Sequence, residues 1–160
     1  MEKLNSVIEK FNEDNIVLVG LGESFTVNEE NVLRLEKILN GKNYFIVSLS
    51  NNKDIDDYSL DSERIALPFA DENNDRWEKY LSFLQNTINK NLLIFELGVG
   101  FLQPEVIRFP FEKTTFYNKK ATLIRVNKNF YQLSKEISER GIAIKEDPSL
   151  FLEQLLDSLN

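Results

Sequence analysis

Short, almost entirely apolar runs, each followed by a helical pattern, are the feature that most constrains the fold of this chain. The clearest runs are Ile16–Val19, Leu92–Leu97 and Ala121–Val126. Continuous rather than alternating hydrophobicity is typical of strands that are buried on both faces of a parallel sheet. Amphipathic segments between the runs supply the crossover helices that parallel strands require. The pattern therefore predicts an α/β fold over residues 1–160, a single domain with a three-layer, doubly wound parallel sheet.

Weaker patterns complete the expected order of elements. The shorter strand candidates are Tyr44–Leu49, Arg64–Leu67 and Ile142–Ile144. Apolar residues at helical spacing predict one helix over the first dozen residues and another over Trp77–Ile88. Three further helices are expected to begin at capping or proline positions, namely Asn28, Pro104 and the pair Asp147 and Pro148.

The composition excludes several kinds of chemistry. The chain has no cysteine and no histidine, so it can form neither a disulfide nor a thiolate zinc site, and it lacks the commonest acid/base group at neutral pH. No compact loop has the ligand spacing of a metal site, so neither zinc nor another metal is expected; the alternative is an all-carboxylate magnesium or calcium site assembled from side chains distant in sequence. The formal charge of −7, from 26 acidic and 19 basic residues, argues against a general nucleic-acid binder. Without an apolar run of signal-peptide or membrane-spanning type, the expected location is the cytoplasm, with no membrane partner.

Two Gly-x-Gly pairs contain four of the six glycines of the chain. Gly20-Leu21-Gly22 and Gly98-Val99-Gly100 each follow a predicted buried strand. In a doubly wound fold, ligands bind at the carboxyl ends of the strands, where glycine lets backbone amides approach a phosphate. The first pair, with the Ser24 hydroxyl as an added donor, therefore predicts a phosphate site. The alternative is a pair of tight turns without a ligand, and the third glycine of the dinucleotide fingerprint is missing.

A family resemblance adds to this pattern. It is carried by Glu96–Phe101, Pro104, Ile107-Arg108, Pro110–Glu112 and Ala121–Lys128. These segments resemble the carboxyl-terminal Rossmann half of bacterial sirtuin-like proteins, close to the branch that is linked to macrodomains. The resemblance is specific over Trp77–Asn129 and looser on either side. It implies a Rossmann-like fold of the sirtuin/DHS type that binds NAD.

The resemblance also implies which residues contact the nucleotide. The segment from Gly20 to Ser24 matches the loop that wraps the NAD pyrophosphate, and Gly98 to Gly100 matches the loop at the adenosine ribose and phosphate. Asn127 would bind the ribose, Asp147 would lie beside the adenine, and Asn51 falls in the place of the family's Asn-Asp motif. The implied set for NAD or ADP-ribose is Gly20, Leu21, Gly22, Ser24, Asn51, Gly98, Val99, Gly100, Asn127 and Asp147. Arg108, Arg125 and Lys128 are further candidates to offset phosphate charge, and surface solubility explains them equally well.

The departures from the family concern catalysis. The catalytic histidine and the zinc module are absent, and the chain has no room for the small domain that carries them. No catalytic residue is therefore assigned. Glu23 places a carboxylate inside the predicted phosphate loop, where it repels a pyrophosphate unless it points outward.

Three hypotheses about function follow. The first is a non-catalytic module that binds NAD, ADP-ribose or a related adenine nucleotide. The second is a ligand-free Rossmann scaffold that binds a protein partner or a second copy of itself. The third is an NAD glycohydrolase or ADP-ribosyltransferase that uses carboxylates, drawn from the acidic residues between Asp54 and Asp75.

Overall fold

A six-stranded, fully parallel sheet forms the centre of the computed structural model, which describes residues 2–72 and 74–159. The strands are β1 (Ile16–Leu21), β2 (Asn43–Ser48), β3 (Ile65–Ala66), β4 (Leu92–Leu97), β5 (Ala121–Val126) and β6 (Gly141–Ile144). Their spatial order is β3-β2-β1-β4-β5-β6. The chain thus builds one half of the sheet outward from β1, returns to the centre, and builds the other half from β4. This is the doubly wound, Rossmann-like topology that the sequence predicts.

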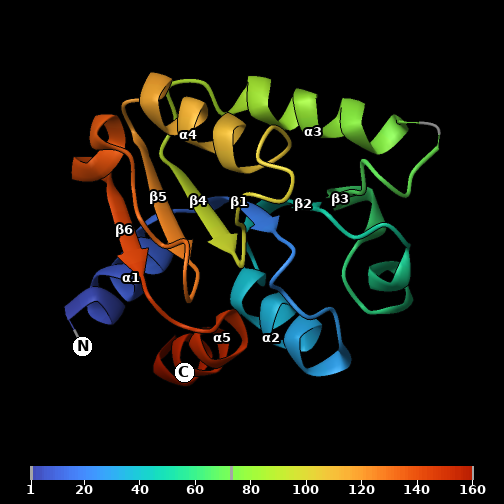
Figure 1. Cartoon of the computed structure of the whole chain (residues 1–160), viewed down its shortest axis with the longest axis horizontal. Helices are drawn as coiled ribbons and strands as arrows, with labels where there is room; N and C mark the ends of the chain where they lie inside the picture. The colour runs from blue at the N-terminus through green and yellow to red at the C-terminus, as the bar shows by residue number, and fades with distance from the viewer. Residues whose placement is uncertain (1, 73, 160) are drawn as a thin grey trace.

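Helices cover both faces of the sheet (Figure 1). They are α1 (Glu2–Glu13), α2 (Glu29–Leu39), α3 (Asp75–Asn86), α4 (Arg108–Tyr117) and α5 (Pro148–Leu159), with short 3-10 turns at Asp54–Asp57, Ser62–Arg64 and Lys135–Arg140. One core lies under α1, α2 and α5 and includes Phe11, Leu35 and Phe151. The other lies under α3 and α4 and includes Tyr80 and Phe111. The sheet is therefore the middle of three layers, as predicted.

Two predicted helix starts are confirmed by their caps. The Asn28 side chain accepts a hydrogen bond from the Asn31 amide at the start of α2 (2.9 Å). The Asp147 carboxylate accepts one from the Leu150 amide at the start of α5 (3.1 Å), and Pro148 is the first helical residue. Both contacts satisfy amides that have no partner within the helix.

The prediction that a helix begins at Pro104 is wrong. Residues 103–107 form a non-helical turn, in which the Val106 amide donates to the Gln103 carbonyl (3.2 Å). Helix α4 begins at Arg108, and Ile107 before it has a φ of −121° and a ψ of −57°, which is neither helical nor extended. The apolar residues at helical spacing over Trp77–Ile88 do not all belong to the buried face of α3. Leu81 is exposed and Ile88 lies beyond the end of the helix, whereas Phe83 is buried.

In the described part of the chain, no helix combines the length and the apolar character needed to cross a membrane.

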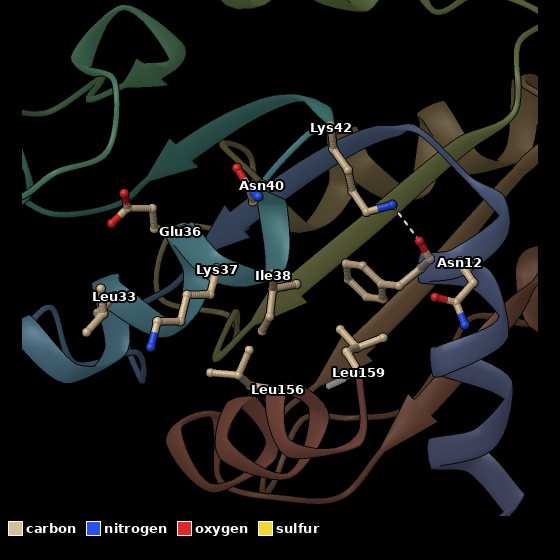
Figure 2. A pocket seen from close by; sticks show the side chains of 10 residues that line it. Asn12, Leu33, Glu36, Lys37, Ile38, Asn40, Lys42, Leu156 and Leu159 are labelled. Atoms are coloured by element: carbon tan, nitrogen blue, oxygen red, sulfur yellow. Dashed lines mark hydrogen bonds between the residues drawn. The ribbon is translucent and has the colours of Figure 1, made fainter.

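A hollow of about 620 Å³ lies among α1, α2 and α5 near the amino ends of β1 and β2 (Figure 2). The Lys42 ammonium group reaches across it and donates hydrogen bonds to the carbonyls of Phe11 and Asp14. These carbonyls belong to the carboxyl end of α1, where a cation complements the helix dipole. The hollow lies at the amino ends of the strands, whereas the glycine pairs follow their carboxyl ends. The two hydrogen bonds of Lys42 are those of a helix cap.

Asp14 is a buried carboxylate at this helix end, and replacing it with asparagine is expected to stabilise the protein at neutral pH. Its Oδ2 atom has no hydrogen-bond partner among the described residues, and the nearest cation, Lys10, is 3.8 Å away. Burial raises the pKa of Asp14, and Glu13 adds to this effect, while Lys10 and Lys42 oppose it. A raised pKa means that the ionised form costs stability in the folded state. We expect a gain on the order of 1 kcal/mol, because asparagine removes the buried charge and keeps a polar group of the same size.

The pH dependence distinguishes this cause from a change in packing. Both the folded and the unfolded wild-type protein carry a neutral Asp14 below the unfolded pKa, so the advantage of Asp14→Asn should vanish in acid and appear as the pH rises through the folded pKa. Urea denaturation across this pH range measures the difference. A constant difference at all pH values would rule out the ionisation of Asp14 as its source.

Candidate nucleotide site

The two Gly-x-Gly segments lie side by side at the carboxyl ends of β1 and β4, the two central strands. Leu21 and Leu97 are register partners at this edge. The Gly22 amide donates to the Leu97 carbonyl (3.0 Å), and the Ser24 amide donates to the Gly98 carbonyl (3.0 Å). The order of the strands reverses between β1 and β4, and this switch point is where doubly wound folds bind their ligands. The segments are therefore in the expected place, but the amides of Gly22, Ser24 and Gly98 already have backbone partners.

Gly22 and Gly98 allow the two segments to touch through their backbones. A Cβ atom at Gly22 would lie 2.3 Å from the Gly98 carbonyl oxygen and 2.4 Å from Val99 Cα. Gly98 has a φ of +69°, and a Cβ atom there would lie 2.7 Å from the Phe25 backbone nitrogen. A side chain at either position would therefore collide with the backbone of the other segment and force the two segments apart.

Gly20 has a different position from the one that the sequence suggests. It lies within β1, paired with Val47 and Glu96, rather than in the turn. A Cβ atom at Gly20 would meet the side chains of Ile107 and Phe111 at 2.7 Å. Gly20 thus lets α4 and the preceding turn pack closely on the sheet.

Glu23 crosses from the first segment to the second. Its Oε1 accepts a hydrogen bond from the Gly100 amide (2.9 Å), and its Oε2 accepts one from the Leu102 amide (2.9 Å). Gly100 leaves space for this carboxylate, since a Cβ atom there would lie 2.9 Å from Glu23 Oε2. We call the Gly100 and Leu102 amides the amide pair. The anion that the amide pair binds in this structure is the carboxylate of Glu23.

A cavity of about 670 Å³ opens beside Glu23, at the carboxyl ends of β1 and β2. Its walls come from the first glycine turn, the segment after β2, the 3-10 turn at Asp54, and the residues that follow Gly100. The lining residues are Leu21, Gly22, Glu23, Phe25, Val27, Ser48, Leu49, Ser50, Asn51, Asn52, Asp54, Phe69, Leu102 and Gln103. Asn51, expected from the resemblance, thus lines the same cavity as Gly22. Leu102 and Gln103 were not predicted from the sequence, although their place just after a Gly-x-Gly pair was a usable signal.

Asn127 lies behind this site and is buried. Its Nδ2 donates to the Val99 carbonyl (3.1 Å), and its Oδ1 accepts from the amides of Asn129 and Phe130 (2.9 Å each). The side chain therefore joins the second glycine segment to the loop after β5. These contacts use both acceptor positions of Oδ1 and one of the two Nδ2 hydrogens.

The remaining predicted residues lie at the margin or apart. Ser24 is exposed at the first turn and does not line the cavity. Gly98, Val99 and Gly100 are buried beside the first turn, and they do not line the cavity either. Asp147 is exposed after β6, where it caps α5, and it does not line the cavity.

Two buried arginines near the second turn are committed to internal contacts. Arg125 pairs with Glu96 through Nε (2.7 Å) and Nη2 (3.1 Å), and its Nη1 pairs with Glu112 (2.9 Å). Arg108 donates to the carbonyls of Val99, Phe130 and Gln132, and its guanidinium carbon lies 4.2 Å from the centre of the Phe101 ring. Burial lowers the pKa of Arg108, and the charge of Arg125 adds to this effect. Neither guanidinium group faces the cavity, so phosphate charge there would be met chiefly by backbone amides.

Within the described ranges, 2–72 and 74–159, no cluster of three or more acidic side chains has an arrangement that could hold a metal ion.

Comparison with known proteins gives a limited match. No family model matches the chain. A protein of Staphylococcus aureus named "Protein ADP-ribosyltransferase" is 30% identical over 79 residues, which cover 49% of this chain and 25% of that protein. The crystal structure of an exopolyphosphatase-related protein from Bacteroides fragilis superimposes with a TM-score of 0.60 at 12% identity, over 99% of this chain and 44% of the other.

These matches support the fold and a distant relationship to a protein of that name. The structural neighbour shows the α/β fold alone, because its sequence identity is low. The matching segment spans only a quarter of the length of the Staphylococcus aureus protein. The more specific sirtuin resemblance stays a prediction.

Proposed function

We propose that this chain is a non-catalytic binding module for NAD, ADP-ribose or a related adenine nucleotide, bound at the carboxyl ends of β1, β2 and β4. The observation that carries the proposal is the amide pair beside a cavity of about 670 Å³. Two amides that converge on one carboxylate have the geometry that also suits a phosphate group. The similarity to a protein named as an ADP-ribosyltransferase supports a ligand that contains ADP-ribose.

The residues around the cavity support binding rather than catalysis. The chain has no histidine. The acidic side chains that line the cavity are Glu23, whose oxygens are held by the amide pair, and Asp54, which is exposed. A carboxylate whose two oxygens both accept backbone hydrogen bonds is not free to approach a substrate proton, as a general base must.

Thermal unfolding with added nucleotide tests the proposal. ADP-ribose at a hundred times its dissociation constant should stabilise the protein by about 2.7 kcal/mol, which corresponds to a rise in Tm of roughly 5–11 °C for a domain of this size. Adenosine, which lacks the phosphates, should give a smaller rise. Incubation with NAD should release no nicotinamide. The binding proposal fails if millimolar ADP-ribose leaves Tm unchanged, and release of nicotinamide would show an enzyme instead.

A second candidate function is docking of a protein partner over the same rim. The observation that favours it is a group of exposed apolar side chains, with Phe101 and Phe130 in edge-to-face contact (5.4 Å between ring centres) and Leu102 and Phe69 at the cavity. Exposed apolar groups of this kind are common at protein interfaces. Light scattering and co-purification test this candidate, and a monomer that binds ADP-ribose with Leu102 exposed would remove its support.

A further inference from the structure

We propose that Glu23 is an internal competitor for the phosphate subsite. Its carboxylate fills the amide pair when no nucleotide is present, and a phosphate group of the ligand must displace it to bind. This inference rests on the proposed function, because it concerns how the same site is regulated.

Glu23 occupies a subsite that is suited to an incoming anion. Each carboxylate oxygen accepts one amide hydrogen bond at 2.9 Å, and the space around it exists because residue 100 has no side chain. Two phosphate oxygens could accept the same two bonds. Glu23 and Leu102 both line the cavity, so the subsite is continuous with the space proposed for the rest of the ligand.

Glu23 can leave while the subsite stays in place. Glu23 is an exposed residue, so its carboxylate can return to water without a large desolvation cost. The loop that carries the amide pair is held independently, because the Val99 carbonyl accepts hydrogen bonds from Arg108 and Asn127. The amides should therefore remain aligned when the carboxylate moves away.

The negative charge of Glu23 adds to the competition with the ligand. Displaced Glu23 would stay close to the phosphate, and the buried guanidinium groups of Arg108 and Arg125 make internal contacts instead of facing the cavity. Repulsion between the carboxylate and the phosphate therefore adds to the competition. A neutral side chain at position 23 should relieve the repulsion, and a short one should also empty the subsite.

Titration calorimetry with ADP-ribose on four proteins tests the inference: wild type, Glu23→Ala, Glu23→Gln and Glu153→Gln. Glu153 is an exposed acidic residue on α5, so its variant removes one negative charge away from the site. Glu23→Ala should bind at least about tenfold more tightly than wild type. The apparent affinity of wild type is its intrinsic affinity multiplied by the fraction of molecules in which Glu23 has left the amide pair. Glu23→Gln should lie between the two, and Glu153→Gln should stay within about twofold of wild type.

The outcomes separate the inference from the proposed function. If wild type binds ADP-ribose and both Glu23 variants bind it equally or more weakly, Glu23 is not a competitor although the binding function stands. If none of the four proteins binds, the proposed function fails, because even an emptied subsite takes no nucleotide. Glu23→Gln preserves the size of the side chain, so the comparison remains valid if Glu23→Ala loosens the turn.

Discussion

Arg125→Met is expected to lower the free energy of unfolding by about 3–5 kcal/mol, the usual cost of leaving one member of a buried ion pair without its partner. Arg125 and Glu96 are both fully buried, and the guanidinium group binds both oxygens of the Glu96 carboxylate. Methionine fills similar space but leaves Glu96 charged and unpaired. Glu112 should suffer less, because its side chain is 21% exposed and can return to water. Urea denaturation measures the loss, which corresponds to roughly 6–20 °C in Tm.

The double variant Glu96→Leu/Arg125→Met is the matched control. It removes both charges together, and replacement of a whole buried pair by apolar residues is often neutral or stabilising. Most of the stability lost in Arg125→Met should therefore return. A single variant within about 1 kcal/mol of wild type would show that Glu96 becomes neutral or hydrated at little cost.

Gly22→Ala is expected to destabilise the protein by roughly 3 kcal/mol, at the upper end of the range for overpacked sites. The new methyl group would lie 2.3 Å from the Gly98 carbonyl oxygen and 2.4 Å from Val99 Cα. Both atoms are backbone, so no side-chain rotation can relieve the contact. The two glycine turns would have to separate, which would also disturb the amide pair.

Gly41→Ala controls for the intrinsic effect of replacing glycine. Gly41 has a φ of +80° after α2, but a Cβ atom there would meet nothing within 4 Å. Its expected cost is the backbone penalty alone, about 1–2 kcal/mol. Denaturation of both variants under one set of conditions gives the comparison. A smaller loss in Gly22→Ala than in Gly41→Ala would show that the contact between the two turns is not rigid.

The fold could be predicted from the sequence because the central strands are short apolar runs with clear ends. Leu92–Leu97 and Ala121–Val126 match β4 and β5 at both ends. Pro104 misled the prediction of α4, because a proline that suits a first helical turn suits an isolated turn equally well. The boundary at Arg108 depends on the conformation of Ile107, for which the sequence carries no local signal.

The site could be predicted in its position but not in its contacts. Both Gly-x-Gly pairs follow buried strands, which places them at one edge of a parallel sheet. The partners of the polar groups come from distant parts of the chain: Glu23 binds an amide 79 residues away, and Arg125 pairs with a carboxylate 29 residues away. Such pairings follow from tertiary packing, which local patterns do not encode.

The central claim is that the amide pair is the phosphate subsite of a nucleotide-binding module. The most direct measurement is the backbone amide spectrum of ¹⁵N-labelled protein during titration with ADP-ribose. We expect the resonances of Gly100, Leu102 and the Glu23 amide to shift together as the ligand concentration rises, while the resonances of residues that line the hollow at Lys42 stay unchanged. Saturable shifts elsewhere, with Gly100 and Leu102 unchanged, would contradict the central claim.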